Sequence, residues 1–487
     1  MALPQTDEDW LTYLSIRHDA ELPVLEDLNR YYEGTQPLSY MHPEVLKEVG
    51  DRIRAVIINW PQLIVDSIEE RLDVEGFRLP DADTGDKSLW AWWQYNNMDE
   101  QTQLGHVDAL TMKRYYVSIG ANEDDEDMPI GAAESPLEMY ADIDPRTRQV
   151  RAALRRVVDD DVIGNIAEHA ASLYLPNSTI HYSRSANGQD WKVEDRDDHN
   201  LGVVPVVPVV NRARLSTARR TGPNRKLPQR GRFGMSELSA VIPLSDAACK
   251  IATDMMVAAE FLALPIRGLF GIGPQDLEDE HGNKLTAIQT LLRRLLTIPV
   301  GTEEGAQSFE FAGANLAGFH ESLNSLARFV ASLSGLPPDF LGFTTDNPAS
   351  ADAIRSAEAR LVKRCERKQR AYGGSYEQVC RIVRRFQEDD WDPKLRRLEA
   401  MWRDPSTPTY AQMADAAVKL YATPDGKEPI VPLRQTREKL GFTDGQVTQM
   451  EKEDAKFRRE NPLGEIARGL SDRGLIGQPA ADDGDAA

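Results

Sequence analysis

The sequence has little cysteine. Its 487 residues include only Cys249, Cys365 and Cys380. An odd number of cysteines without a CxxC pair predicts neither a disulfide framework nor a zinc site. We therefore expect the three thiols to be small apolar residues on helix faces.

The sequence also lacks a long apolar run. A membrane-spanning helix needs roughly 20 apolar residues, and the nearest candidate, 203–210, is short and contains Pro205 and Pro208. The N-terminus carries Asp7, Glu8 and Asp9, where a secretory signal would be positively charged. These features predict an intracellular protein with no membrane partner.

Motifs of catalysis are missing as well. There is no GxxxxGK(S/T) phosphate loop, no HExxH metal motif and no GxSxG hydrolase turn. The eight histidines are scattered without ligand spacing. Acidic clusters such as 159–161 could bind two metal ions for phosphodiester cleavage, but a chain with 78 acidic residues contains such clusters by chance. The sequence thus predicts no catalytic residue, no metal site and no cofactor.

The sequence also has fewer basic residues than acidic ones. The chain has 57 Lys and Arg against 78 Asp and Glu, a net charge of −21. Stable DNA binding normally uses basic surfaces that release counterions. The charge therefore argues against a protein that wraps nucleic acid and is compatible with one that lets DNA pass. Taken alone, it indicates only solubility and mutual repulsion.

One segment departs from this balance. Residues 212–233 contain eight Arg and Lys and no acid, with Gly and Pro that favour irregular structure. Two interpretations stay open: a contact with DNA phosphates or an acidic partner, and a solvated insertion. The candidate contact residues are Arg219, Arg220, Arg225, Lys226 and Arg230.

Hydrophobic periodicity predicts an α+β fold that is predominantly helical. The first 115 residues read as helical, and residues 115–211 read as short strands. An aromatic group at 90–93 reads as core packing or a subunit contact rather than a ligand site. Helices are predicted at 22–33, 42–72, 90–93, 236–262, 285–296, 314–334, 350–386, 410–421 and 434–440. Strands are predicted at 115–119, 149–158, 170–175, 179–182, 191–193, 296–300 and 308–311. Residues 444–459 are strongly charged.

A helix, a polar loop and a long helix follow one another between 314 and 386. Gly335, Pro337 and Pro338 stop the first helix, and Ser350 is a candidate N-cap for the second. Residues 350–386 would span on the order of 55 Å, with a kink or interruption expected at Gly373-Gly374. This long helix carries a basic face that could meet DNA or acidic neighbours in adjacent subunits: Arg360, Lys363, Arg364, Arg367, Lys368 and Arg370.

Several passages, taken in order, resemble the portal (head–tail connector) proteins of long-tailed double-stranded-DNA bacteriophages. Leu28-Asn29-Arg30-Tyr31-Tyr32-Glu33-Gly34 is similar to the Tyr-Tyr-x-Gly signature of that family. The segment 202–211 is similar to its Pro-rich strand ending in Asn. Residues 234–238 and 244–247 resemble the start of its first stem helix, and 335–343 with 350–361 resemble its second stem helix, tunnel loop and long helix. The similarity covers roughly residues 22–445.

The resemblance implies a portal-type fold with wing, stem, clip and crown. By position, the wing would be 1–233, the stem helices 234–263 and 313–335, and the clip 264–312. The tunnel loop would be 336–349, the long helix 350–388 and the outer wing and crown 389–473. Residues 474–487 would form a disordered tail. The basic segment 212–233 is longer than expected before the stem, so its place in wing or clip stays open.

The resemblance also implies a function without an active site. Twelve copies would form a ring at one capsid vertex, through which double-stranded DNA is packaged and ejected. Thr344, Thr345, Asp346 and Asn347 of the tunnel loop would contact DNA weakly. The implied partners are the terminase large subunit, the scaffold and major capsid proteins and a head–tail adaptor. The protein would be found in the virion, and in the host cytoplasm during assembly. Two alternatives stay open: a minor structural head protein, and a metal-dependent nucleic-acid-processing enzyme.

Overall fold

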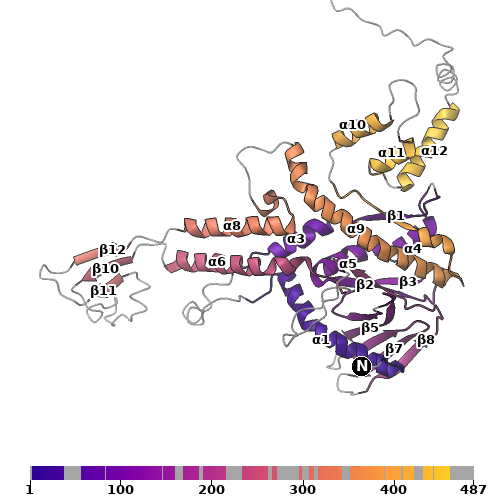
Figure 1. Cartoon of the computed structure of the whole chain (residues 1–487), viewed down its shortest axis with the longest axis horizontal. Coiled ribbons are helices and arrows are strands. Elements are labelled where there is room, and N and C mark those ends of the chain that lie inside the picture. The colour runs from indigo at the N-terminus through magenta and orange to yellow at the C-terminus, as the bar shows by residue number, and fades with distance from the viewer. Residues whose placement is uncertain are drawn as a thin grey trace, which may run out of the picture.

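The computed structural model has an elongated shape (Figure 1). A body of helices and sheets carries a two-helix arm on one side and a group of short helices outside its upper edge. The mixture of helix and sheet confirms the predicted α+β class. The structure describes residues 3–37, 56–82, 84–144, 146–159, 168–185, 190–214, 233–261, 266–270, 295–298, 307–311, 316–342, 351–388, 390–406, 410–421, 431–442 and 444–460.

The N-terminal helix α1 spans Asp7–Glu33. Thr6 begins it with a capping box, and Gly34 ends it in the left-handed conformation with φ +67°. The two tyrosines of the Tyr-Tyr-x-Gly passage fasten its last turn. Tyr31 Oη donates to Asp246 at 3.0 Å, and Tyr32 Oη donates to Asp66 at 3.0 Å.

The predicted helix over 42–72 is wrong in its middle. Residues 56–59 are not helical, and α3 spans Trp60–Glu69 with Asn59 as its N-cap. Asn59 Nδ2 also donates to Tyr32 O at 2.8 Å, which places the start of α3 beside the end of α1. The cap residue followed by Pro61 is a helix start that hydrophobic periodicity alone does not reveal. Residues 42–55 of that prediction lie outside the described residues.

The main core lies around a three-stranded sheet of order β3-β2-β9. Its antiparallel strands are β2 (Arg114–Gly120), β3 (Ile130–Glu134) and β9 (Val206–Val210). Helices α4 (Lys87–Tyr95) and α5 (Met98–Met112) pack beside it. Trp92 and Trp93 are fully buried here, and Trp90 packs against the same core. Of the two interpretations of the aromatic group at 90–93, core packing is therefore confirmed.

A second sheet is antiparallel, with order β4-β5-β6-β7-β8. Helix α1 packs on it through Leu11 and Leu14, which join a separate small core. The strands are β4 (Met139–Ile143), β5 (Val150–Asp159), β6 (Glu168–Tyr174), β7 (Thr179–Ser185) and β8 (Lys192–Asp197). These bounds confirm the strands predicted between 149 and 193.

The long helix α9 spans Ala351–Gln387 and crosses the front of the body in Figure 1. It continues as a helix through Gly373 and Gly374, so the predicted interruption there is wrong, while the alternative, a kink, stays a prediction. A Cβ at Gly373 would lie 3.2 Å from Trp402 Nε1. The glycine therefore serves close packing against β13 (Glu399–Trp402), which pairs with β1 (Val74–Arg78). Cys365 and Cys380 of α9, like Cys249, are buried free thiols, as predicted.

The C-terminal helices form a small group linked by ion pairs. Arg434 pairs with Glu451 at 2.8 Å, and Arg437 pairs with Asp454 at 2.7 Å. Arg78 of β1 reaches Glu438 at 3.2 Å and connects this group to the body. The helices α10 (Tyr410–Tyr421) and α11 (Leu433–Lys439) lie close to the predicted bounds. A third helix, α12 (Asp444–Glu460), covers the strongly charged segment for which no helix was predicted.

Candidate functional site at the base of the arm

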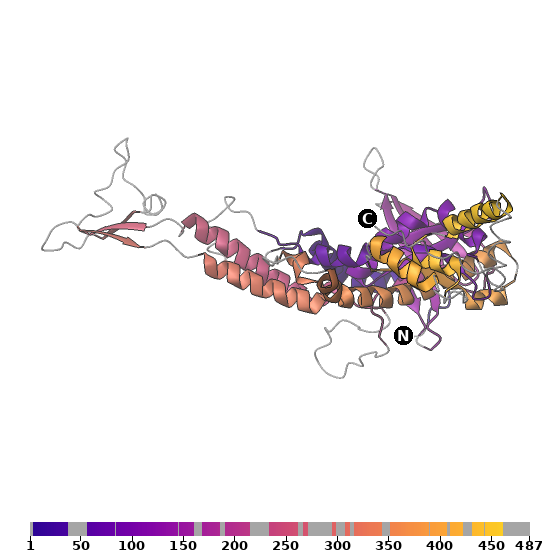
Figure 2. The same ribbon diagram turned by 90° about the horizontal axis from the view of Figure 1, so that it is seen from above.

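The arm consists of two helices that lie side by side in both views (Figures 1 and 2). They are α6 (Ile242–Phe261), which follows the short 3-10 helix η2 (Glu237–Ala240), and α8 (Ala317–Ser334). Small buried side chains allow the close approach: Ala248 and Ala252 from α6, and Ala327 and Ala331 from α8. At the tip lies a sheet of order β11-β10-β12, built from Leu295–Ile298, Ile266–Phe270 and Gln307–Phe311.

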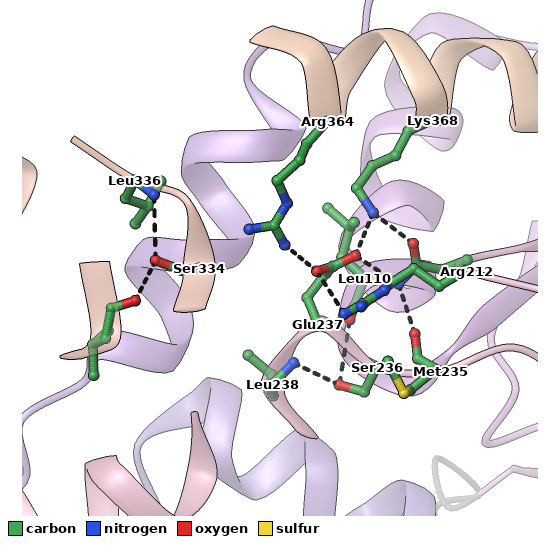
Figure 3. Close-up of polar contacts among 12 residues, drawn as sticks. Leu110, Arg212, Met235, Ser236, Glu237, Leu238, Ser334, Leu336, Arg364 and Lys368 are labelled. Carbon is green, nitrogen blue, oxygen red and sulfur yellow. Dashed lines mark hydrogen bonds and ion pairs between the residues drawn. The ribbon is translucent and has the colours of Figure 1, made fainter. Parts of the chain in front are cut away.

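A buried carboxylate fixes the start of the arm to the long helix. Glu237, in η2, is 3% exposed, and Arg364 and Lys368 of α9 both donate to it (Figure 3). Arg212 approaches the same carboxylate at 3.5 Å. We call Glu237, Arg212, Arg364, Lys368 and Asn211 the Glu237 cluster.

Asn211 completes this cluster from the end of β9. Its Oδ1 accepts from Lys368 Nζ at 2.6 Å, and its Nδ2 donates to Met235 O at 2.8 Å and to Glu237 Oε1 at 3.3 Å. Ser236 caps η2 by accepting from Leu238 N at 3.0 Å. The cluster therefore joins β9, the base of α6 and α9 at one buried point.

The ion pairs decide the charge state of Glu237. Burial alone would raise the pKa of this carboxyl, but Lys368, Arg364 and Arg212 outweigh that effect and lower the pKa to about 2. The carboxylate thus stays charged in the folded protein near neutral pH. For Lys368, burial is the larger influence and lowers the pKa despite the opposing effect of Glu237.

The depressed pKa predicts an acid-sensitive contribution to stability. A carboxyl with a folded pKa of about 2, against an ordinary 4.5, stabilises the fold above pH 4.5, and this contribution is lost as the pH falls toward 2. We expect the difference in unfolding free energy between wild type and Glu237→Gln to be about 3 kcal/mol at pH 6 and to shrink progressively below pH 4.5. Denaturant titrations from pH 6 to pH 3 measure it.

A difference that stays constant across this range would contradict the assignment. The comparison isolates Glu237 because Glu21, whose pKa is also lowered to about 2 beside Arg114, is present in both proteins.

The second helix of the arm is held by the next turn of the same long helix. Arg360 Nη1 donates to Ser332 O at 2.7 Å, near the end of α8. Gly335 ends α8 in the left-handed conformation, and a Cβ there would lie 3.2 Å from Arg360. Arg360, Arg364 and Lys368 are spaced by four residues, so one face of α9 contacts the bases of both arm helices.

The predicted DNA-contacting residues lie outside this description. Thr344, Thr345, Asp346 and Asn347 fall in 343–350, between Gly342 and the start of α9, and lie outside the described residues. The described parts on either side are a buried Leu336, the 3-10 helix η4 (Pro338–Leu341) and α9 itself. The role of these four residues stays a prediction.

The basic segment 212–233 is described only at its ends. Arg219, Arg220, Arg225, Lys226 and Arg230 lie outside the described residues. Its two ends meet, because Met235 N donates to Asn211 O at 2.9 Å. Phe233 stacks on Tyr140 and lies 5.0 Å from the guanidinium of the buried Arg114. The segment therefore leaves and rejoins the body at a single place.

Two of the cations on the basic face of α9, Arg364 and Lys368, have a partner within the chain. Both interpretations of that face, DNA and adjacent subunits, are wrong for Arg364 and Lys368, whose partner is Glu237 of the same chain. The sequence analysis missed Glu237 and Asn211. The sequence signal for them is their position at the end of an element: Asn211 directly follows β9, and Glu237 is the first residue of η2.

No three His, Cys, Asp or Glu side chains in the described part of the chain gather closely enough to hold a metal ion. No helix among the described residues combines the length and apolarity that crossing a membrane requires.

The model of the family described as phage portal protein, SPP1 Gp6-like, matches residues 11–460. The chain belongs to this family. Two relatives, each named portal protein, agree with the assignment to portal proteins. That of Mycobacterium phage D29 is 35% identical and covers 98% of this chain and 94% of its own. That of Mycobacterium phage L5 is 38% identical and covers 86% of this chain and 81% of its own.

Two solved structures overlap with this portal chain more loosely. One is the neck of an empty GTA particle computed with C6 symmetry, with a TM-score of 0.43 and 13% identity over 83% of this chain and 95% of that one. The other is the neck of a native GTA particle computed with C12 symmetry, with a TM-score of 0.40 and 12% identity over 86% and 93%. The family assignment rests on the sequence matches alone.

Proposed function

We propose that twelve copies of this chain close into a ring at one vertex of a phage capsid. Double-stranded DNA passes through the ring during packaging and ejection. The proposal is carried by one observation beyond family membership. Both helices of the arm are fastened at their bases to α9, by the Glu237 cluster and by Arg360. The helices α8 and α9, which precede and follow 343–350 in the chain, are therefore joined to each other at the base of the arm.

The parts of the chain take roles in this ring. We assign the wing to 1–233, the stem to 234–263 and 313–335, and the clip to 264–312 at the tip of the arm. The clip meets the terminase large subunit and later the head–tail adaptor, while the body meets the scaffold and major capsid proteins. The tunnel loop is 336–349, the long helix 350–388, and the outer wing and crown 389–473. The ring is a virion component that assembles in the host cytoplasm.

Charge supports passage of DNA rather than capture. A net charge of −21 per copy repels phosphates, so a duplex inside the ring slides without tight contacts. The polar residues Thr344, Thr345, Asp346 and Asn347 supply weak contacts without base readout. No catalytic step is required, and the role is structural.

The ring is tested by cryo-electron microscopy of the purified protein. We expect closed rings with a central hole wide enough for duplex DNA. Light scattering that finds a lone polypeptide under all conditions, including with scaffold and capsid proteins, overturns the proposal. Particles without a central hole would favour a minor head protein. Nuclease or ATPase activity with magnesium, abolished by one carboxylate substitution, would favour an enzyme.

A further inference from the structure

The outer face of α9 carries three exposed cations. Lys363, Arg367 and Arg370 recur at intervals of three and four residues and therefore share one face of the helix. Lys363 pairs with Glu366 of the same helix. Neither Arg367 nor Arg370 forms an ion pair with any residue in the described ranges. We call these three residues the basic ridge.

The ridge is unusual for this chain. Acidic residues outnumber basic ones by 78 to 57, and the neighbouring cations Arg364 and Lys368 both form ion pairs with Glu237. Two unpaired guanidinium groups less than one turn apart repel each other. Their presence on a strongly acidic protein favours an anionic partner from outside the chain.

An acidic group lies on the other side of the same helix. Asp66, Glu69, Glu70 and Asp73 surround the C-terminal end of α3, and we call them the acidic corner. The end of α3 contacts α9 through Cys365, whose Sγ lies 3.9 Å from Ile68 O, and through Gln369, which donates to Arg71 O. At 100° per residue, these contact positions lie about 150° around the helix axis from the basic ridge.

The acidic corner is poorly compensated within one chain. The C-terminal end of a helix disfavours negative charge, and the last turn of α3 has no basic residue. Glu69 and Glu70 form no ion pair with any described residue, and Arg403 reaches Asp73 only at 3.5 Å. Burial and then the charges of Asp73, Glu70 and Asp66 raise the pKa of Glu69 to about 7.

We propose that the basic ridge of one copy docks on the acidic corner of the adjacent copy. The inference rests on the ring of the proposed function and names a contact that closes it. Because the two patches differ and lie on opposite sides of α9, the contact is head-to-tail, which is the kind that builds rings. DNA is the other possible anion, but a duplex on the ridge would leave the acidic corner uncompensated.

Charge reversal tests the pairing. The variant Arg367→Glu/Arg370→Glu and the variant Glu69→Lys/Glu70→Lys should each raise the protein concentration needed for half-maximal assembly by about tenfold or more. The quadruple variant, which combines all four substitutions and so reverses both patches, should assemble again near the wild-type concentration. Mass photometry and light scattering measure the assembled fraction. Lys192→Glu/Lys394→Glu, on exposed lysines elsewhere, is the matched control for added negative charge and should assemble normally.

Each failure has a distinct meaning. Reversal variants that assemble like wild type overturn the inference, while wild-type rings in the same experiment leave the proposed function standing. If the reversal variants lose assembly and the quadruple variant does not regain it, the pairing with the acidic corner is overturned. Normal rings that package less DNA after Arg367→Glu/Arg370→Glu would assign the ridge to DNA instead. If thermal melts show that a reversal variant is unfolded, Glu69→Gln/Glu70→Gln and Arg367→Gln/Arg370→Gln replace it, with weaker assembly expected for each.

Discussion

Replacing Glu237 by glutamine is expected to lower the free energy of unfolding by about 3 kcal/mol. The substitution keeps the size of the side chain and removes its charge. Lys368, which is 6% exposed, and the partly buried Arg364 would then remain beside each other without the carboxylate that neutralises them. Chemical denaturation of the purified protein at pH 7 measures the loss.

Two further variants make this prediction specific. Glu194→Gln removes the same charge from an exposed position in β8 and should change stability by less than about 0.5 kcal/mol. Combining Glu237→Gln with Lys368→Met removes the buried cation as well and should recover part of the loss. A Glu237→Gln variant as stable as the Glu194→Gln control would mean that the cluster contributes nothing to the fold.

The same substitution should loosen the arm from the long helix. The contacts of Glu237 span 127 residues to Arg364 and 131 residues to Lys368. With these contacts gone, the contacts that hold the base of α6 include the hydrogen bonds of Tyr31 to Asp246 and of Ser245 to Ile58 O. In the proposed ring, the frame around 343–350 would become less rigid. Faster amide exchange in η2 and the first turns of α6 would show it.

Local signals explain which elements could be predicted. The prediction for α10 matches its bounds, and α8 ends at Gly335 as expected. Both follow from the sequence because the residues that favour a helix and those that end it are close together in the chain. The strands of the second sheet likewise follow from alternation and turn residues. The interruption predicted at Gly373-Gly374 was wrong, because Gly373 instead allows the close approach of Trp402 from a distant strand.

The candidate site could be predicted only in outline. The helix–loop–long-helix passage locates the arm and α9 from sequence alone. The Glu237 cluster does not follow from any local pattern, since its residues come from three distant segments. A lone glutamate in a chain with 78 acids carries no sign of burial. The same reasoning offered only outside partners for the six cations of α9, although within the chain Arg364 and Lys368 pair with Glu237 and Arg360 donates to Ser332 O.

Replacing Gly234 by alanine is expected to destabilise the protein by about 4 kcal/mol or more. Gly234 has φ +77°, where an L-residue is strained. A Cβ there would also lie 2.4 Å from Asn211 O and 2.6 Å from Lys113 O. Both neighbours are backbone atoms. Asn211 also belongs to the Glu237 cluster, so its backbone cannot move aside without disturbing the hydrogen bonds of that cluster.

Gly202 provides the matched control for this experiment. It has a similar φ of +74°, and no atom lies within 4 Å of its added Cβ. Gly202→Ala therefore carries only the backbone strain, about 1–2 kcal/mol. Denaturant titration of both variants separates the two effects, and the excess loss in Gly234→Ala measures the close approach of the two ends of the basic segment. Equal losses in the two variants would show that the junction yields to the extra methyl group, and that the start of the arm is less firmly fixed than its hydrogen bonds to Asn211 indicate.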